Sequence, residues 1–493
     1  MSLTKLTTLG ALKASGYQSR SIKEELRANL LKKLQSGEKV FEGIRAFDTT
    51  VIPDIERAIL SRHNILLLGL RGQAKTRMAR MMTRLLDEWI PVVKGSEIND
   101  DPFHPISRYA RDLIAGQGDD TVIEWMHRDE RYTEKLATPD VSVADLVGDV
   151  DPIKAANLKL PYSDERVIHF GLIPRSHRCI FVINELPDLQ ARIQVALFNI
   201  LQEGDMQIRG FKLRLPLDIE FVFTANPEDY TNRGSIVTPL KDRIESQILT
   251  HYPKDLESAR EITRQEAHPS REQAEAIRIP PLAEDLLEQI AFEARSSEYI
   301  DPKSGVSARL TISAKENLYS TVERRIILNK ETTGCVRIAD FQGVIPSITG
   351  KIELVYEGEQ EGTQIVAQNL VGKAVRTLFT RYFPSPEKSK KKKEPNPYQP
   401  VLDWFSSGHE LDLLHDIPAK QYQKTLSGVP GLKEIVQQFH PQAKGDEQLL
   451  LMEFLLHGLA EFSLLSRGNL QTGTRFKDLF SSVMNSGAGD EQS

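Results

Sequence analysis

Short apolar runs, each followed by polar residues, mark the first half of the chain. Ile65–Leu68 is apolar throughout, and residues 77–86, after a glycine-containing turn, have a helical pattern. Two further runs, Cys179–Ile183 and Ile219–Ala225, are rich in β-branched and aromatic residues, and a helix is expected between them over 190–201. Such runs suit strands that are covered on both faces of a parallel sheet. The order of strands and helices therefore predicts an α/β fold class.

The pattern on either side of these runs is largely helical. Residues 20–62 are expected to be helical: Ser21 offers a capping start, apolar residues recur at helical spacing as far as Leu34, and a second helix is expected after Pro53, over 55–60. For 91–134 the sequence predicts only a polar region interrupted by Pro, Gly and Asp. Beyond Pro253, helices are expected at 254–266, 282–296, 310–328, 341–356 and 363–382.

Pattern and composition together predict how the chain is divided. The expected parts are an N-terminal helical segment (1–40), an α/β domain (41–252) with a loop-and-hairpin insertion near 137–171, a helical domain (253–383), a charged linker (384–400), a C-terminal helical domain (401–484) and a disordered tail (485–493). The linker is rich in lysine and proline. Nothing aromatic interleaves its lysines, so a solvated linker is favoured over a nucleic-acid-binding segment.

The turn after the first apolar run has the residue order of a phosphate-binding loop, Gly-Leu-Arg-Gly-Gln-Ala-Lys-Thr. Such a loop turns successive backbone N–H groups inward, and the helix that follows adds the partial positive charge of its N-terminus. Lys75 can then reach the β- and γ-phosphates of ATP, and the Thr76 hydroxyl can coordinate Mg²⁺. The other expected nucleotide-binding positions are Gly69, Leu70, Arg71, Gly72, Gln73 and Ala74.

Ala74 departs from the pattern GxxxxGK[ST], which has a glycine at this position. A methyl group is acceptable there if the residue has a negative φ, and it is not acceptable if φ must be positive. A chance resemblance to a phosphate-binding loop is the alternative, and residues further along the chain have to decide between the two.

The later apolar runs end in residues that suit ATP hydrolysis. Asn184 and Glu185 follow one run, where P-loop ATPases hold Mg²⁺ and orient the attacking water. We expect Glu185 to polarise this water and Asn184 to contact the metal site, although an amide lacks the charge of an aspartate. Asn184→Asp is therefore expected to preserve or raise turnover. Asn226 ends the other run and is expected to position the water, while its Asn-Pro sequence also suits a turn.

Two arginines are candidates for acting on the nucleotide. Arg243 follows a short helical turn and, in a ring of subunits, could enter the neighbouring site as an arginine finger. A surface salt bridge is the alternative for this residue. Arg309 begins a helix in the second domain, from which it could reach the nucleotide and report its state.

These motifs occur together and in order, and the set resembles the MoxR and magnesium-chelatase ATPase-subunit branch of the AAA+ family. The resemblance covers about residues 40–330 and is strongest between 64 and 253. It implies a P-loop AAA+ core, a helical lid domain at 253–383 and a C-terminal helical extension outside the shared core. MoxR proteins are similar in carrying alanine where Ala74 stands, and 137–171 resembles the insertion of this branch. The resemblance implies Lys75 and Thr76 as Walker A, Asn184 and Glu185 as Walker B, Asn226 as sensor 1, Arg243 as the finger and Arg309 as sensor 2.

Composition adds only limits. The chain has 493 residues, 40% of them hydrophobic, and a formal net charge of −6, which gives no general case for nucleic-acid binding. Its two cysteines are expected to be reduced thiols. The first twenty residues lack the apolar core of a signal peptide, and no apolar run approaches the length of a membrane span. A cytoplasmic location without a membrane partner is therefore expected.

The expected function is Mg²⁺-dependent ATP hydrolysis by a ring, expected to be a hexamer, that remodels or loads a partner protein. By resemblance the partner is a von Willebrand A-domain protein, with metal or cofactor insertion as the task. Alternatives are a nucleotide-gated scaffold with little hydrolysis and a magnesium-chelatase motor subunit. A DNA-associated motor is a weaker choice because the sequence has no recognisable reading motif.

Overall fold

The computed structural model describes residues 3–162, 164–203, 205–206, 215–227, 236–387 and 396–479. The chain forms two compact units, Met1–Tyr252 and Pro253–Ser493, and their hydrophobic clusters are separate. The predicted tail at 485–493 lies outside the described residues, as does 388–395 of the predicted linker.

A five-stranded parallel sheet forms the centre of the first unit. Its strands lie in the order β11 (Ser246–Leu249), β1 (Ile65–Leu68), β10 (Ile219–Ala225), β7 (Cys179–Asn184) and β4 (Tyr132–Leu136). The strands β1, β7 and β10 are buried along their whole length. Strands covered on both faces have no solvent side, which explains why their sequences are continuous apolar runs. The predicted parallel sheet is confirmed.

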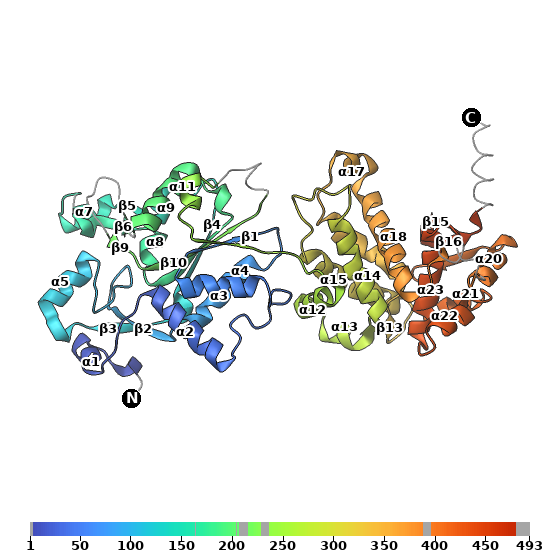
Figure 1. The fold of residues 1–493 in the computed structure, drawn as a ribbon, viewed down its shortest axis with the longest axis horizontal. Coiled ribbons are helices and arrows are strands. Elements are labelled where there is room, and N and C mark those ends of the chain that lie inside the picture. Colours follow the sequence, from blue (N-terminus) through green and yellow to red (C-terminus); the bar gives the residue numbers. More distant parts are fainter. Residues whose placement is uncertain are drawn as a thin grey trace. The chain divides into compact units, whose positions relative to one another are not determined.

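Helices cover both faces of this sheet, and alternate strand residues feed a separate hydrophobic cluster on each face. The cluster that contains Leu67 and Val182 joins the sheet to α2 (Ile22–Ser36), α3 (Val51–Ser61) and α4 (Lys75–Met81). The cluster that contains Leu66 and Phe181 joins it to α8 (Leu172–Arg175), α9 (Ala191–Glu203) and α11 (Thr238–Lys241). Figure 1 shows these two groups of helices on opposite sides of the strands.

A buried ion pair fixes the edge strand β4. Arg131, directly before β4, donates to both oxygens of Glu25 on α2 at 2.7 and 2.8 Å and to the carbonyl of Arg178 at 2.9 and 3.0 Å. The side chains of Arg131 and Glu25 are only 1% and 4% exposed. Such a bidentate pair is geometrically specific, so it holds β4 in a fixed place beside β7.

Smaller elements surround the sheet. They are α1 (Leu9–Ala14), the antiparallel strands β2 (Trp89–Val93) and β3 (Ile123–His127), α5 (Arg108–Gln117), α6 (Val143–Leu146), α7 (Pro152–Leu158), the antiparallel strands β5 (Gly148–Val150) and β6 (Ile168–Phe170), and the antiparallel strands β8 (Asp205–Met206) and β9 (Leu215–Pro216). The region 91–134, in which the sequence predicts no helix or strand, thus contains parts of several strands and one α-helix. Within 137–171, α7 leaves Ile153 and Leu158 exposed.

The second unit is mainly helical. Its elements are α12 (Leu256–Glu266), α13 (Arg271–Ala276), α14 (Pro281–Arg295), α15 (Arg309–Leu328), α16 (Ile345–Thr349), α17 (Tyr356–Glu361), α18 (Thr363–Tyr382), α20 (Gln399–Ser406), α21 (Ala419–Ser427), α22 (Leu432–Phe439), α23 (Asp446–Glu461), the short parallel pair β12 (Ile277–Arg278) and β13 (Gly334–Cys335), and the strands β14 (Leu411–Leu414), β15 (Ser466–Leu470) and β16 (Gly473–Lys477).

Two sequence predictions for this unit need correction. The helix expected at 341–356 is wrong as a single element, because α16 ends at Thr349 and a non-helical segment follows, with Leu354 bridged to Ile300. The part after the linker is not purely helical, since β14, β16 and β15 form an antiparallel sheet. One hydrophobic cluster runs from Ile277 to Phe476, so the residues on both sides of the linker share a core.

The described residues also bear on two general expectations. Within them, no helix combines the length and the apolar character needed to cross a membrane. Cys179 and Cys335 are both free thiols, as predicted. Burial raises the pKa of each thiol to about 12, so neither is ionised near neutral pH.

Candidate nucleotide site

The loop between β1 and α4 is braced by the end of β11. Thr250 donates to the side-chain oxygen of Gln73 at 2.6 Å, and the Tyr252 hydroxyl donates to the carbonyl of Arg71 at 2.8 Å. A side chain at Gly69 would collide with Thr250 and Gln73. Glycine is therefore required at the first position of the loop by close approach, and the loop has one defined path.

Ala74 has a positive φ, the conformation in which alanine is not expected. Its φ is 55° and its ψ is 17°, in the left-handed region, directly before the first residue of α4. A left-handed conformation costs an L-residue about 1–2 kcal/mol. The expectation that a positive φ would exclude alanine is therefore wrong: the cost is small beside the packing and hydrogen bonds that hold the loop.

Lys75 is buried at the base of the loop, with an exposed fraction of 8%. Its Nζ donates to the carbonyl of Gly69, to the carbonyl of Leu70 at 3.0 Å and to Oδ1 of Asn226 at 2.7 Å. The ammonium group is thus held between the carbonyl groups that begin the loop and the residue that follows β10. Leu70, Ala74 and Thr76 are half-buried, whereas Arg71 and Gly72 are exposed.

The carboxyl ends of β7 and β10 bring the other candidates to the same edge of the sheet. Oδ1 of Asn184 accepts from the Thr76 hydroxyl at 3.1 Å and from the Thr224 hydroxyl at 3.0 Å. Nδ2 of Asn226 donates to Oε2 of Glu185 at 2.7 Å. Asn226 therefore lies between the ammonium group of Lys75 and the carboxylate of Glu185, with its oxygen and nitrogen facing opposite charges.

Glu134 belongs to this cluster, and no motif in the sequence marks it. It lies on β4, and its Oε1 accepts from Nδ2 of Asn184 at 2.6 Å. The run Tyr132–Leu136 has three consecutive polar residues, two of them charged, so no apolar pattern marks it as a strand of the central sheet. The pairing of β4 with β7 supplies the contact, and pairing of distant segments is not visible in local sequence.

Arg243 is held by contacts outside this cluster. Arg243, just after α11, stacks over the ring of Phe198 at 4.2 Å and donates to Gln202 at 3.1 Å and to Asp242 at 3.0 Å, with 29% of its side chain exposed. These contacts lie within its own chain. Arg309 is exposed at the first residue of α15, in the second unit.

The donor set at the strand ends suits a hard cation with phosphate ligands. Thr76 offers a hydroxyl, Asn184 an amide oxygen, and Glu185 and Glu134 offer carboxylates. Mg²⁺ takes oxygen ligands and is held in nucleotide enzymes by few protein groups together with substrate phosphates. The residues present therefore fit Mg²⁺ bound together with a nucleotide. Thr76 and Asn184 are the residues that would contact the metal.

Comparison with known proteins gives only distant likenesses. No family model matches the chain. Similar solved structures include NtrX from Brucella abortus (17% identity, TM-score 0.35, 59% of this chain and 54% of that chain), a model of the BchI–BchD complex of magnesium chelatase (19%, 0.31, 63% and 93%) and a RuvB mutant from Thermotoga maritima (11%, 0.32, 82% and 93%). This chain thus spans about half of that NtrX chain. The values are low, so the function rests on the residues of the site.

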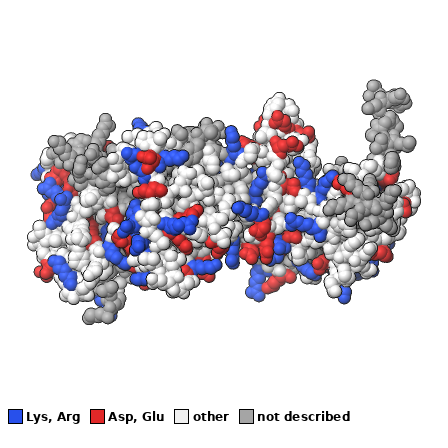
Figure 2. Space-filling model, viewed as in Figure 1, with Lys and Arg blue, Asp and Glu red and all other residues white. Residues whose placement is uncertain are grey.

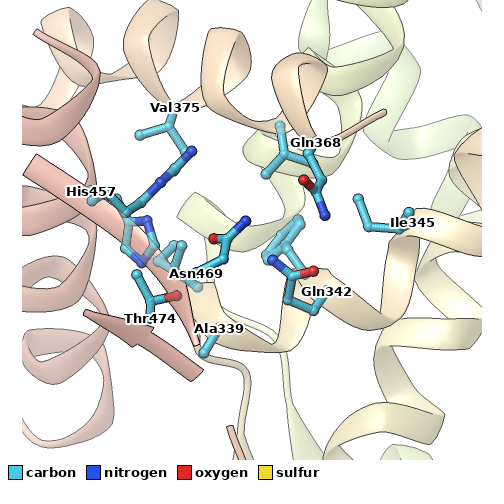
Figure 3. Close-up of a pocket in the computed structure, with 12 residues that line it drawn as sticks. Ala339, Gln342, Ile345, Gln368, Val375, His457, Asn469 and Thr474 are labelled. Carbon is cyan, nitrogen blue, oxygen red and sulfur yellow. The ribbon is translucent and has the colours of Figure 1, made fainter. Parts of the chain in front are cut away.

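A separate cavity lies inside the second unit (Figure 3) and is lined by Gln342, Gln368, Asn469, Thr474 and His457. Burial lowers the pKa of His457 to about 3, so its imidazole is neutral, and its Nε2 has no hydrogen-bond partner among the described residues. The cavity volume of ≈ 50 Å³ has room for water but not for a nucleotide. The strand-end cluster therefore stays the candidate nucleotide site.

Proposed function

We propose that this chain is a Mg²⁺-dependent ATPase that forms a ring and remodels or loads a partner protein. The observation that carries the proposal is the convergence of Lys75, Thr76, Asn184, Glu185 and Asn226 at the carboxyl ends of β1, β7 and β10. Phosphoryl transfer needs little covalent chemistry from the protein and depends on positioning and charge stabilisation. A braced loop with a buried lysine beside an amide–carboxylate pair meets that need.

Each residue has a separate task in this proposal. Lys75 exchanges its bonds to the loop carbonyls for bonds to phosphate oxygens, because a charged phosphate is the stronger acceptor. Glu185 orients the attacking water, and Asn226 holds the Glu185 carboxylate and the Lys75 ammonium at a set separation. Thr76 and Asn184 hold the metal side of the site. Bound Mg²⁺ would offset the charge that develops on the phosphate oxygens.

Assembly into a ring is the part of the proposal that concerns Arg243 and Arg309. Arg243 is partly exposed and stacked on α9, and to act as a finger it would leave Phe198 and enter the neighbouring subunit's site. Arg309 is exposed at the start of a long helix, as a nucleotide-sensing residue needs to be. We take a hexamer as the ring, on the resemblance to AAA+ ATPases alone.

The partner is proposed from the same resemblance. A MoxR-like or magnesium-chelatase-like ATPase implies a client or a von Willebrand A-domain partner, with insertion of a metal or cofactor as the task, in the cytoplasm. A magnesium-chelatase motor subunit is the closest alternative. On the face that Figure 2 shows, basic and acidic side chains are intermingled, which gives no support to the alternative of a DNA-associated motor.

A nucleotide-gated scaffold is the second candidate function, and one observation favours it. Asn184 stands where P-loop ATPases have an acid at the metal, and an amide attracts Mg²⁺ less strongly. In this case the ring would bind ATP and scarcely hydrolyse it. The ATP would then act as an assembly signal.

The decisive test compares ATP binding and turnover in wild type and Glu185→Gln. If Glu185 orients the water, Glu185→Gln should bind ATP as wild type does and lose about 10²–10⁴-fold in turnover. Glu130→Gln is the matched control, because it is the same chemical substitution at an exposed residue that lies shortly before β4. Wild type that binds ATP but turns over no faster than Glu185→Gln would support the scaffold instead. A pull-down with the Glu185→Gln trap would then identify the client.

A further inference from the structure

The carboxylate of Glu134 lies beside Asn184 on the adjacent strand. Oε1 of Glu134 accepts from Nδ2 of Asn184 at 2.6 Å. Oε2 accepts from the Tyr132 hydroxyl at 3.0 Å and from the Arg80 guanidinium at 2.8 and 2.9 Å. The two oxygens thus have different donors. Among the described residues, Oε1 accepts a hydrogen bond only from Asn184.

These bonds determine which way the amide of Asn184 faces. Its nitrogen points to Glu134, so its oxygen points to Thr76 and Thr224 at 3.1 and 3.0 Å. Without a carboxylate acceptor on β4, the amide could turn over and present its N–H₂ group to Thr76. An amide nitrogen cannot serve a cation, so the orientation that Glu134 imposes is the one that Mg²⁺ requires.

The pair also places a negative charge at this edge of the site. A hydrogen bond to a carboxylate polarises the amide and strengthens the partial negative charge on its oxygen. The position of Glu134 is itself fixed, because β4 is anchored by the Arg131–Glu25 pair and Arg80 reaches Glu134 from α4, the helix that begins with Lys75 and Thr76.

We propose that Glu134 is a positioning residue for the metal: acting through Asn184, it supplies the charge that an aspartate at position 184 would carry. The inference rests on the proposed function, since it concerns the same site. In metal sites, outer groups that orient a ligand contribute about 10- to 100-fold to metal affinity. In this proposal the negative charge lies on Glu134 of β4, the strand next to β7, instead of on residue 184 itself.

This arrangement reverses the expectation for Asn184→Asp. The substitution would set a carboxylate oxygen against Oε1 of Glu134 at hydrogen-bond distance with no hydrogen between them. Like charges this close repel, and both would sit at a partly buried strand end. The single substitution should therefore weaken the site. Combining it with Glu134→Gln should repair the site, because the new amide can donate to the new carboxylate.

The test is a double-mutant cycle read out by Mg²⁺-dependent nucleotide binding. The Mg²⁺ concentration for half-maximal binding of a fluorescent ATP analogue is measured for wild type, Glu134→Gln, Asn184→Asp and the double variant, together with the thermal stability of each without nucleotide. We expect Glu134→Gln to need about 10- to 100-fold more Mg²⁺. Asn184→Asp should lower thermal stability, and the double variant should return both quantities to near the wild-type values.

Two controls separate this role from a merely structural one. Arg80→Gln removes the ion pair of Glu134 with an exposed side chain but leaves its bond to Asn184, so the Mg²⁺ requirement should stay the same or fall. Glu130→Gln removes an exposed carboxylate near β4 and should change nothing. If Arg80→Gln and Glu134→Gln raise the Mg²⁺ requirement equally, the ion pair alone matters and the inference is overturned.

Other outcomes are equally clear. Independent, additive effects of Glu134→Gln and Asn184→Asp would also overturn the inference, because the proposal requires the second change to rescue the first. A wild-type protein that binds no ATP would remove the proposed function itself. Normal Mg²⁺-ATP binding by both wild type and Glu134→Gln would remove only the role of Glu134.

Discussion

Both compact units bury polar side chains, but they bury them in different places. In the first unit Lys75, Asn184 and Asn226 meet at the carboxyl edge of a parallel sheet, next to a loop and a helix N-terminus. In the second unit Arg325 and Asp340 are both 2% exposed and pair within the helix packing at 3.0 and 3.1 Å. Burial of polar groups alone therefore does not mark a site. Their place relative to strand ends and helix N-termini does.

The partners of the buried groups differ in the same way. Glu453 of the second unit accepts from the backbone N–H groups of Ile338 and Ala339 and from the Tyr422 hydroxyl. These bonds tie α23 to the residues before α16 and to α21, so they serve the fold. At the strand ends of the first unit, the proposed function requires Lys75 and Asn226 to exchange some of their bonds for bonds to a ligand.

The largest effect is expected for Lys75→Ala. Loss of the ammonium group should abolish ATP binding, because Lys75 is the buried cation of the loop and is held beside Asn226, whereas the other cation of the loop, Arg71, is exposed. The free energy of unfolding should change by less than about 1 kcal/mol, since the loop remains braced by Thr250 and Tyr252. Isothermal titration with ATP and urea unfolding measure the two quantities. Normal ATP affinity in a folded variant would refute the assignment of Lys75.

Arg243→Ala comes next. If Arg243 acts on a neighbouring subunit, isolated protomers should bind nucleotide normally, while hydrolysis by the assembly should fall about 10³-fold or more. Mixing Arg243→Ala with Glu185→Gln subunits should restore part of the activity, because some interfaces then pair an intact Glu185 with an intact Arg243. Mixed assemblies that stay inactive despite proven co-assembly would leave Arg243 as a residue that packs on Phe198.

Asp340→Asn should affect stability and leave ATP binding unchanged. Breaking a buried pair leaves the Arg325 charge uncompensated, and the free energy of unfolding should fall by about 3–5 kcal/mol. Asp412→Asn is the matched control: Asp412 pairs with Arg475 at 2.7 Å, but both side chains are about two-fifths exposed, so the loss should be below about 1 kcal/mol. Denaturant unfolding with a nucleotide-binding assay measures both. Reduced ATP affinity in folded Asp340→Asn would break the separation between the units.

The smallest effect is expected for Glu220→Gln, and it depends on pH. Glu220 on β10 is buried, and burial raises the pKa of its carboxyl to about 8, partly opposed by Lys23 and supported by Glu245 and Asp218. Because the folded pKa lies above the unfolded one, the folded state holds the extra proton, and stability falls as pH rises from about 4.5 to 8. Glu220→Gln should therefore match wild type near pH 5 and be more stable by a few kcal/mol at pH 9.

Urea unfolding at a series of pH values checks this prediction, with Glu130→Gln as an exposed control. A difference between Glu220→Gln and wild type that is constant from pH 5 to pH 9 would show that the Glu220 carboxyl titrates normally. The predicted pH dependence would instead identify Glu220, like Glu25, as a buried acid that affects the stability of the first unit.

The loop and the buried strands could be predicted because their signals are local. Ile65–Leu68, Cys179–Ile183 and Ile219–Ala225 are continuous apolar runs, and strands buried on both faces have to be so. Ser21 caps α2 as expected, and α15 spans Arg309–Leu328. The prediction that a positive φ excludes alanine at position 74 was wrong, because the small conformational cost is outweighed by the packing around the loop.

Local sequence was enough to predict the buried parallel strands, the loop between β1 and α4 and the polar residues at two strand ends, because each depends on residues within a few positions of one another. Only the tertiary structure decided that Glu134 lies at Asn184, that Asn226 lies between Lys75 and Glu185, and that Arg243 packs on Phe198. These contacts join residues 41 to 151 positions apart. Local propensity does not specify which strands are neighbours in the sheet, because the packing of the whole sheet sets that order.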